Sequence, residues 1–136
     1  MPEPIRIAAA LIEDALGRVL LVRKRGTDAF MQAGGKIEAG ETAFEALARE
    51  LGEELDWTPG ADEAAYLGRF SAEAANEPGH VVEAELFRLR APESGFTLGG
   101  ELEEALWVEP DAVGLVLAPL TRDCVLPLAG RRPGDF

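Results

Sequence analysis

The sequence predicts an α/β fold in which a mixed β-sheet lies between helices. Two short apolar strands open the chain, an amphipathic helix follows, and more strands then precede a last apolar helix. Elements that are apolar on one face must bury that face against a neighbour, so this order favours helices packed on a sheet. The length of 136 residues predicts one domain, residues 1–136, large enough to bury a core.

The first part of the chain predicts a β-hairpin. Residues 5–12 are apolar apart from Arg6 and predict a buried strand, and residues 13–18 predict a turn. Residues 19–23 predict a second strand that pairs with the first. After a loop, residues 36–38 predict another short strand.

An amphipathic helix with an apolar side and an acidic side is predicted to begin at residues 41–42 and to end before residues 59–60, and Thr42 is a candidate N-cap. At about 100° per residue, four apolar side chains share one stripe: Phe44, Leu47, Leu51 and Leu55. The adjoining stripe holds Glu50, Glu53 and Glu54. Carboxylates at this spacing repel one another, and Mg²⁺ or Mn²⁺ would offset the repulsion because these cations prefer oxygen ligands. The acidic side is therefore a candidate metal site, with a merely solvated acidic face as the alternative.

The second half predicts a hairpin and an acidic loop. Residues 66–72 and 80–89 read as strands on either side of a turn at 74–79. Residues 101–108 predict an acidic loop that leads into a strand.

Two helical segments are predicted near the C-terminus. Residues 110–113 predict one helical turn, and residues 117–128 predict a helix with an apolar side. Pro119 suits the first turn of that helix, whereas Pro127 should kink or end it. Residues 131–136 are expected to fray.

Composition and charge exclude several classes of protein. Apolar runs such as residues 7–12 are too short to span a bilayer, so no membrane partner is expected. The chain begins without a secretory signal, and Cys124 is its only cysteine, so a reducing cytoplasm is expected. The net charge of −12 disfavours binding to a nucleic acid polymer. It leaves nucleotides open, because bound metal reverses the local field.

The stretch 34–57 has a defined spacing of glycine, acidic and basic residues. Eight positions define it: Gly35, Glu41, Arg49, Glu50, Leu51, Glu53, Glu54 and Trp57. This pattern resembles the Nudix box, G-x5-E-x7-R-E-U-x-E-E-x-G-U, where U is a bulky apolar residue. Asp56 stands where the family has a glycine that ends the helix in a left-handed conformation. Aspartate tolerates that conformation better than most residues, so the helix end should survive.

The resemblance implies a fold, a reaction and a set of site residues. The implied fold is the Nudix α/β/α sandwich, and the implied reaction is hydrolysis of a nucleoside diphosphate linked to another group. The implied ligands of Mg²⁺ or Mn²⁺ are the Gly34 carbonyl, Glu50, Glu53 and Glu54. Arg49 would orient these glutamates, and Glu41 would pair with Arg49 or hold metal-bound water. Gly35 and Lys36 would lie against phosphate, and the general base would be Glu54 or a glutamate from a loop.

That loop carboxylate must come from outside the box. Members of the family often supply it shortly before an aromatic strand, and Glu101 and Glu104 are the candidates here. Their distances from Trp107 favour Glu101 as the metal ligand, which leaves Glu104 on the substrate side. A merely solvated acidic loop stays open as an alternative.

Three consecutive bases, residues 23–25, are a candidate phosphate clamp, with a solvated basic turn as the alternative. Arg23 is preferred among them because an arginine grips phosphate with two hydrogen bonds. Asn76 and Glu77 are candidate contacts to a base or ribose. His80 is a candidate substrate or acid–base group, but an ordinary strand residue is the preferred interpretation.

The substrate is expected to be a small-molecule nucleotide. The lean loops resemble those of MutT-type enzymes, which favours a (d)NTP or modified NTP cleaved to the monophosphate and pyrophosphate. ADP-ribose or a nucleotide sugar, a dinucleoside polyphosphate, and a nucleotide sensor without turnover remain as alternatives. Homodimers are common in the family, but the sequence identifies no interface.

Overall fold

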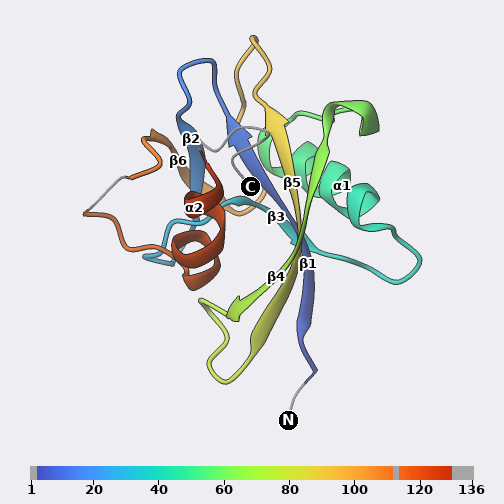
Figure 1. Cartoon of the computed structure of the whole chain (residues 1–136), viewed down its shortest axis with the longest axis vertical. Coiled ribbons are helices and arrows are strands. Elements are labelled where there is room, and N and C mark those ends of the chain that lie inside the picture. The colour runs from blue at the N-terminus through green and yellow to red at the C-terminus, as the bar shows by residue number, and fades with distance from the viewer. Residues whose placement is uncertain (1–2, 112–113, 130–136) are drawn as a thin grey trace.

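The computed structural model describes residues 3–111 and 114–129, and these residues form the layered arrangement that the sequence predicts (Figure 1). Strands and helices follow in this order: β1 Ile5–Glu13, β2 Val19–Lys24, β3 Ala33–Lys36, α1 Ala43–Leu55, a 3₁₀ turn Ala61–Glu63, β4 Ala65–Glu73, β5 Val81–Arg90, β6 Leu102–Val108, a π-helical turn Thr121–Val125 and α2 Leu126–Leu128. The predicted turn at 110–113 lies partly, and the expected fraying at 131–136 wholly, outside the described residues.

β1 is the centre of a mixed six-stranded sheet with the order β4-β5-β1-β2-β6. It pairs in parallel with β5 along its whole length, from Ile5 opposite Val82 to Glu13 opposite Arg90. Its other edge is shared, because β3 pairs with residues 7–10 of β1 and leaves β2 only the end at Glu13. The predicted β1–β2 hairpin is therefore present at its turn, while the rest of β2 diverges and pairs with β6. The predicted β4–β5 hairpin is confirmed.

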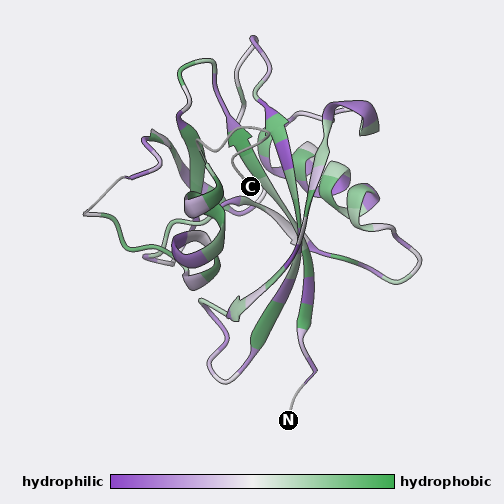
Figure 2. Cartoon of the chain, in the orientation of Figure 1, coloured by the Kyte–Doolittle hydropathy of each residue, from purple (hydrophilic) through white to green (hydrophobic). Residues whose placement is uncertain are grey.

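The sheet separates two apolar clusters. On one face, Ala8 and Ala10 of β1 contact the side of α1 that carries Leu47, Leu51 and Leu55, all with no exposed surface. On the other face, Leu11 of β1 packs with Val125 and Leu126 from the C-terminal helical segment. Figure 2 shows this as apolar colouring along the middle strands. Small alanines in β1 let α1 approach the sheet closely, which fixes where the acidic side of α1 lies.

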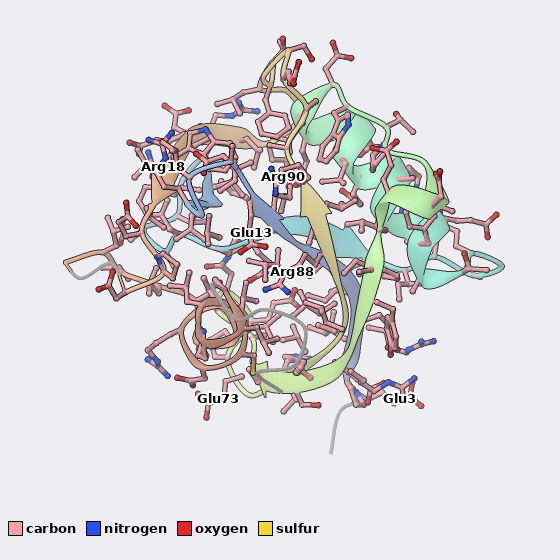
Figure 3. All side chains as sticks on the ribbon, turned by 45° about the horizontal axis from the view of Figure 1, so that its top comes forward. Glu3, Glu13, Arg18, Glu73, Arg88 and Arg90 are labelled. Atoms are coloured by element: carbon pink, nitrogen blue, oxygen red, sulfur yellow. The ribbon has the colours of Figure 1, made fainter. Side chains whose placement is uncertain are left out.

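One ion pair fastens the C-terminal segment to the sheet. Arg88 of β5 lies 2.8 Å from the Glu13 carboxylate of β1 and also donates to the Leu128 carbonyl (Figure 3). The pair is mostly buried, so removing one partner would leave the other charge uncompensated. It holds the segment that closes one wall of the cavity described below.

Both ends of α1 are defined by local hydrogen bonds. Thr42 is the N-cap, as predicted: its hydroxyl accepts from the Glu45 N–H, and the Glu45 carboxylate accepts from the Thr42 N–H. At the other end, Asp56 has φ 52° and ψ 42° and donates its N–H to the Leu51 carbonyl. The prediction that aspartate replaces the usual glycine in a left-handed cap is confirmed.

Three predicted boundaries are corrected. The short strand covers Ala33–Lys36 rather than 36–38, because both glycines pair with β1. Residues 102–104 belong to β6 rather than to a loop, because Glu104 pairs with Arg23 across the sheet. The last helix begins at Pro119, since Leu117 instead bridges to Phe30.

The turn before Pro127 is also wider than predicted. Residues Thr121–Val125 form a π-helical turn in which the Leu126 N–H reaches the Thr121 carbonyl. Proline has no N–H, and in a regular helix its ring would collide with the carbonyl four residues earlier. The wider turn accommodates Pro127 and aims Thr121 at the sheet.

The left-handed cap generates a stability prediction. Replacing Asp56 by glycine should raise the free energy of unfolding by about 1 kcal/mol, because glycine adopts this conformation without a steric cost. Asp56→Ala should lower it, because alanine lacks the tolerance of aspartate. Urea denaturation of the three proteins measures the order; a glycine variant less stable than the parent would contradict the analysis.

Candidate active site

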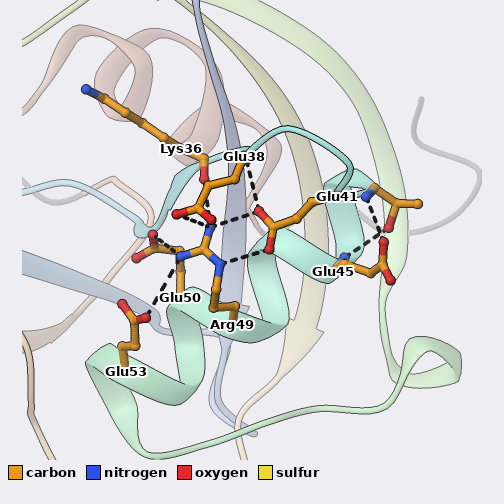
Figure 4. Close-up of polar contacts among 8 residues, drawn as sticks. Lys36, Glu38, Glu41, Glu45, Arg49, Glu50 and Glu53 are labelled. Atoms are coloured by element: carbon orange, nitrogen blue, oxygen red, sulfur yellow. Dashed lines mark hydrogen bonds and ion pairs between the residues drawn. The ribbon is translucent and has the colours of Figure 1, made fainter.

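Arg49 is the centre of a cluster of carboxylates on the acidic side of α1 (Figure 4). Its Nε and Nη2 donate to the two oxygens of Glu41, at 2.8 and 3.0 Å. Its Nη1 donates to Glu50 at 2.9 Å, and its Nη2 also donates to the Lys36 carbonyl at 3.0 Å. The Glu53 carboxylate lies within ion-pair distance, at 3.9 Å. One guanidinium therefore ties the helix to the loop between β3 and α1.

These contacts shift the titration of both partners. Hydrogen bonds from Arg49 and the Glu38 N–H lower the pKa of Glu41 to about 2. Hydrogen bonds to Glu41 and Glu50 raise the pKa of Arg49 above its already high value. Glu41 thus stays ionised at any physiological pH, and the predicted contact between Arg49 and Glu41 is present. Whether Arg49 orients glutamates for a metal stays a prediction.

The two glycines of β3 allow the helix and sheet to meet at this point. Gly34 has φ 142°, and a Cβ there would overlap the Ala8 carbonyl of β1. A Cβ on Gly35 would overlap the carboxyl group of Glu50. Glycine is required at position 34, where the obstacle is the backbone of β1. At position 35 a side chain would displace the Glu50 carboxyl group from its present place.

Glu54 is a buried carboxylate beside these glycines. Its side chain accepts a hydrogen bond from the Gly34 N–H at 3.2 Å, and the residue is only 6% exposed. Burial raises the pKa of Glu54 to about 7; the Gly34 hydrogen bond and Lys24 oppose this rise, while Glu50 and Glu101 add to it. A cation bound near Glu54, in addition to Lys24, would stabilise the ionised form of Glu54.

The loop between β5 and β6 covers the C-terminal end of α1. The Thr97 N–H donates to the Leu55 carbonyl at 3.3 Å, and the Gly99 N–H donates to the Glu54 carbonyl at 2.9 Å. A Cβ on Gly99 would come within 2.7 Å of the Glu53 carbonyl, so glycine is needed for this approach. The loop satisfies carbonyls that a helix end leaves free, and in doing so it brings Glu101 toward Glu54.

The structure distinguishes the two candidate loop carboxylates. Glu101 has a side chain that is 77% exposed and lies 3.6 Å from the Lys24 Nζ. Glu104 lies on β6 and forms an ion pair with Arg23 at 3.1 Å. Glu101 is the more exposed and is held only by its ion pair with Lys24, so it can turn toward an added cation more easily than Glu104, which accepts a hydrogen bond from Arg23.

Arg23 is held by its neighbours, and Lys24 faces the carboxylates. Besides Glu104, Arg23 donates to the Thr27 carbonyl at 2.9 Å and lies over the Phe30 ring. Lys24 pairs with Glu101, acts on Glu54, and lines the neighbouring cavity. The phosphate role of Arg23 stays a prediction. The sequence analysis included Lys24 among the three candidate bases but preferred Arg23; the register shift between Arg23 and Lys24 was not visible in the sequence.

A cavity of about 140 Å³ opens beside Gly34 and Gly35, on the sheet face opposite α1. Its apolar lining includes Ile5, Ile7, Val82, Ala118 and Leu120. Its polar lining includes Lys24, Gln32, Lys36, Asn76 and Glu77. The Lys36 Nζ lies 3.7 Å from Glu77, so the β4–β5 loop and β3 meet at its edge. His80 is not among the residues that line the cavity.

The residues present fit a hard divalent cation, although they do not form a closed site. Among residues 3–111 and 114–129, no three carboxylate, histidine or cysteine side chains already converge as metal ligands. The donors at hand are all oxygens, which is the set that Mg²⁺ and Mn²⁺ prefer. Glu54 is buried with a raised pKa, and Glu53 is 60% exposed and able to rotate. Glu50 now bonds Arg49 and faces Gly35.

Comparison with known proteins agrees with this geometry. The model of the NUDIX domain matches residues 3–127. Over 113 residues the chain is 33% identical to an 8-oxo-dGTP diphosphatase of Haemophilus influenzae, covering 80% of this chain and 79% of the relative. The chain therefore belongs to the Nudix family. Its fold and its carboxylate-rich helix are those of a MutT-like Nudix pyrophosphohydrolase.

Solved structures show the same fold. A MutT NUDIX hydrolase from Burkholderia pseudomallei superposes with a TM-score of 0.77 at 23% identity, over 93% of this chain and 98% of that one. A MutT protein from Methanosarcina mazei has a TM-score of 0.68 at 25% identity, over 85% and 87%. The predicted α/β/α sandwich is confirmed. The helices described here are all too short or too polar to traverse a lipid bilayer.

The burial of Glu54 predicts how the stability of the metal-free protein depends on pH. The folded pKa is about 7 and the unfolded value is 4.5, so folding favours the protonated form. This contribution is fully present below pH 4.5 and is lost as pH rises through 7. Within that window the free energy of unfolding should fall by up to about 1.4 kcal/mol per pH unit relative to Glu54→Gln.

The measurement is urea denaturation of both proteins in EDTA across this pH range. The difference between them isolates Glu54, because Glu41 titrates in both proteins and only at much lower pH. Parallel pH profiles for the two proteins would show that Glu54 is not protonated in the folded state.

Proposed function

We propose that this enzyme hydrolyses a nucleoside triphosphate, or a modified one, to the monophosphate and pyrophosphate with Mg²⁺ or Mn²⁺ as cofactor. One observation carries the proposal: the glycine pair that contacts Glu50 and Glu54 also forms the edge of the cavity. A nucleoside in the cavity would then place its phosphates across β3, against the carboxylates. The similarity to a protein named as an 8-oxo-dGTP diphosphatase supports this substrate class.

In this proposal Glu50, Glu53, Glu54 and Glu101 hold the metal, together with the Gly34 carbonyl. The cation, when bound, would neutralise the diphosphate and lower the pKa of the attacking water. Arg49 keeps Glu50 and Glu53 within reach while Glu41 keeps Arg49 in place. Glu54 or Glu101 accepts the proton of the water, since both lie on the same side of the helix end. Most of the rate acceleration then comes from positioning and charge.

Positive side chains would orient the phosphates. Lys24 and Lys36 both line the cavity, and each pairs with a single exposed carboxylate that a phosphate can replace. Arg23 would join them only by giving up its contacts to Glu104 and Thr27. We therefore propose the two lysines as the main phosphate contacts, with Arg23 and Glu104 as a supporting pair.

The wider setting follows from composition and architecture. We propose a single domain, residues 1–136, because the described strands form one sheet. We also propose the cytoplasm as its compartment and a small nucleotide rather than a nucleic acid polymer as its partner, given one cysteine and a net charge of −12.

The proposal is tested by hydrolysis of a panel of nucleotides with Mg²⁺ and with Mn²⁺, with products separated by chromatography. Nucleoside triphosphates should give a monophosphate and pyrophosphate. Two monophosphate products from ADP-ribose or a nucleotide sugar, with triphosphates left intact, would replace this substrate class. Binding without turnover of any compound would instead indicate a sensor.

Substitutions separate the ligands from their neighbours. Glu53→Gln and Glu54→Gln should each lower turnover by at least about 100-fold, because each removes charge from the site where the transition state is stabilised. Glu101→Gln should lower it more than Glu104→Gln. Asp62→Asn, in the exposed 3₁₀ turn, is the matched control and should leave the rate unchanged. Near-parental rates for Glu53→Gln and Glu54→Gln at saturating Mg²⁺ would refute the ligand assignment.

A further inference from the structure

Gln32 and Thr121 form a buried polar pair in the wall of the cavity. Gln32 is 6% exposed and Thr121 has no exposed surface. The Thr121 hydroxyl donates to the Gln32 Oε1 at 2.8 Å across 89 positions of sequence. Burying these groups among apolar neighbours costs free energy unless their hydrogen bonds are made. A buried polar pair at this place is therefore less favourable for stability than two apolar side chains.

The hydrogen bond fixes the orientation of the Gln32 amide. Thr121 is fully buried, so its hydroxyl hydrogen requires an acceptor, and Gln32 Oε1 provides it. The reverse orientation of the amide would leave that hydrogen without an acceptor at this contact. The two N–H groups of Gln32 Nε2 therefore point away from Thr121.

Those N–H groups belong to a residue in the wall of the cavity. Gln32 lines it, and Nε2 has no partner among residues 3–111 and 114–129. Nε2 is also not among the fully enclosed side-chain atoms of the described chain that lack a hydrogen bond. Gln32 is thus almost buried, its amide oxygen accepts from Thr121, and its Nε2 donors are left for a ligand in the cavity. A leucine at this position would have filled the same space without requiring Thr121.

We infer that Gln32 reads the base of the substrate, and that it selects a base with a keto oxygen, such as guanine, over one with an amino group, such as adenine. This inference rests on the proposed function, because it takes the cavity as the site of the nucleobase. A glutamine commonly binds adenine with its oxygen and nitrogen together. Here the oxygen accepts from Thr121, so the two Nε2 donors are the groups left for a ligand. Guanine offers them two neighbouring acceptors, O6 and N7, whereas adenine offers N7 beside an amino donor. Thr121 is the positioning residue.

Equilibrium binding of dGMP and dAMP tests this inference without turnover or metal. Calorimetry at pH 8 should show that the parent protein prefers dGMP by about tenfold or more, since one discriminating hydrogen bond corresponds to a factor of this order. Gln32→Leu should bring the two affinities together, mainly by weakening dGMP. Gln32→Glu keeps the shape and the bond to Thr121 but offers only acceptors, so it should shift the preference toward dAMP.

Thr121→Val removes the group that orients the amide and should reduce the preference for dGMP without reversing it. Thr97→Val, at an exposed position outside the cavity, is its matched control and should leave the ratio unchanged. Thermal melting of each variant shows whether it folds, and Gln32→Glu serves if Gln32→Leu does not.

If the contact between Gln32 and Thr121 only connects the residue before β3 to the C-terminal segment, its substitution would lower stability. The ratio of dGMP to dAMP affinity would then stay unchanged. Equal affinities in the parent protein, absence of binding to both nucleotides, or a preference that survives in Gln32→Leu would each overturn the inference. Failure of the parent protein to hydrolyse triphosphates would refute the proposed function instead, and the binding ratio would still decide the role of Gln32.

Discussion

The structure depends on holding several carboxylates close together in a chain with a net charge of −12. Arg49 makes this arrangement stable before any metal arrives: it contacts Glu41 through two hydrogen bonds, bonds Glu50, and lies within ion-pair distance of Glu53. Planar arginine suits this position, because its fixed set of donors serves several acceptors at once. Glu54 lies outside these contacts, and it is the carboxylate whose pKa rises toward 7. Arg49 thus offsets the charge of Glu41, Glu50 and Glu53, whereas a cation near Glu54 would stabilise its ionised form.

Backbone packing places this cluster beside the cavity. Small residues in β1 and the two glycines of β3 let α1 lie close to the sheet. As a result, the carboxylates of α1 and the cavity both contact β3. The loop before β6 then covers the end of α1 and brings Glu101 to the same point. The carboxylate cluster and the cavity therefore lie toward opposite faces of the sheet, and both contact β3.

The sequence predicted the parts of this arrangement that are local. The periodicity of α1, the cap at Thr42 and the left-handed Asp56 depend on neighbouring residues, and all three could be read from the chain. What it could not predict depends on partners distant in sequence. Arg23 was preferred as a phosphate ligand, yet its pairing with Glu104 became visible only with the register of β2 and β6. Gln32 could not be singled out from the sequence, because its proposed role depends on a contact with Thr121, 89 positions away.

Mn²⁺ binding to Arg49→Gln shows whether Arg49 positions carboxylates for a metal. Removing a positive charge should by itself strengthen cation binding, whereas loss of positioning should weaken it, so the two effects have opposite signs. Electron paramagnetic resonance of free Mn²⁺ gives the affinity without nucleotide or turnover. We expect the variant to bind Mn²⁺ at least about tenfold more weakly than the parent, as for loss of a group that supports metal ligands. Equal or tighter binding by the variant would contradict it.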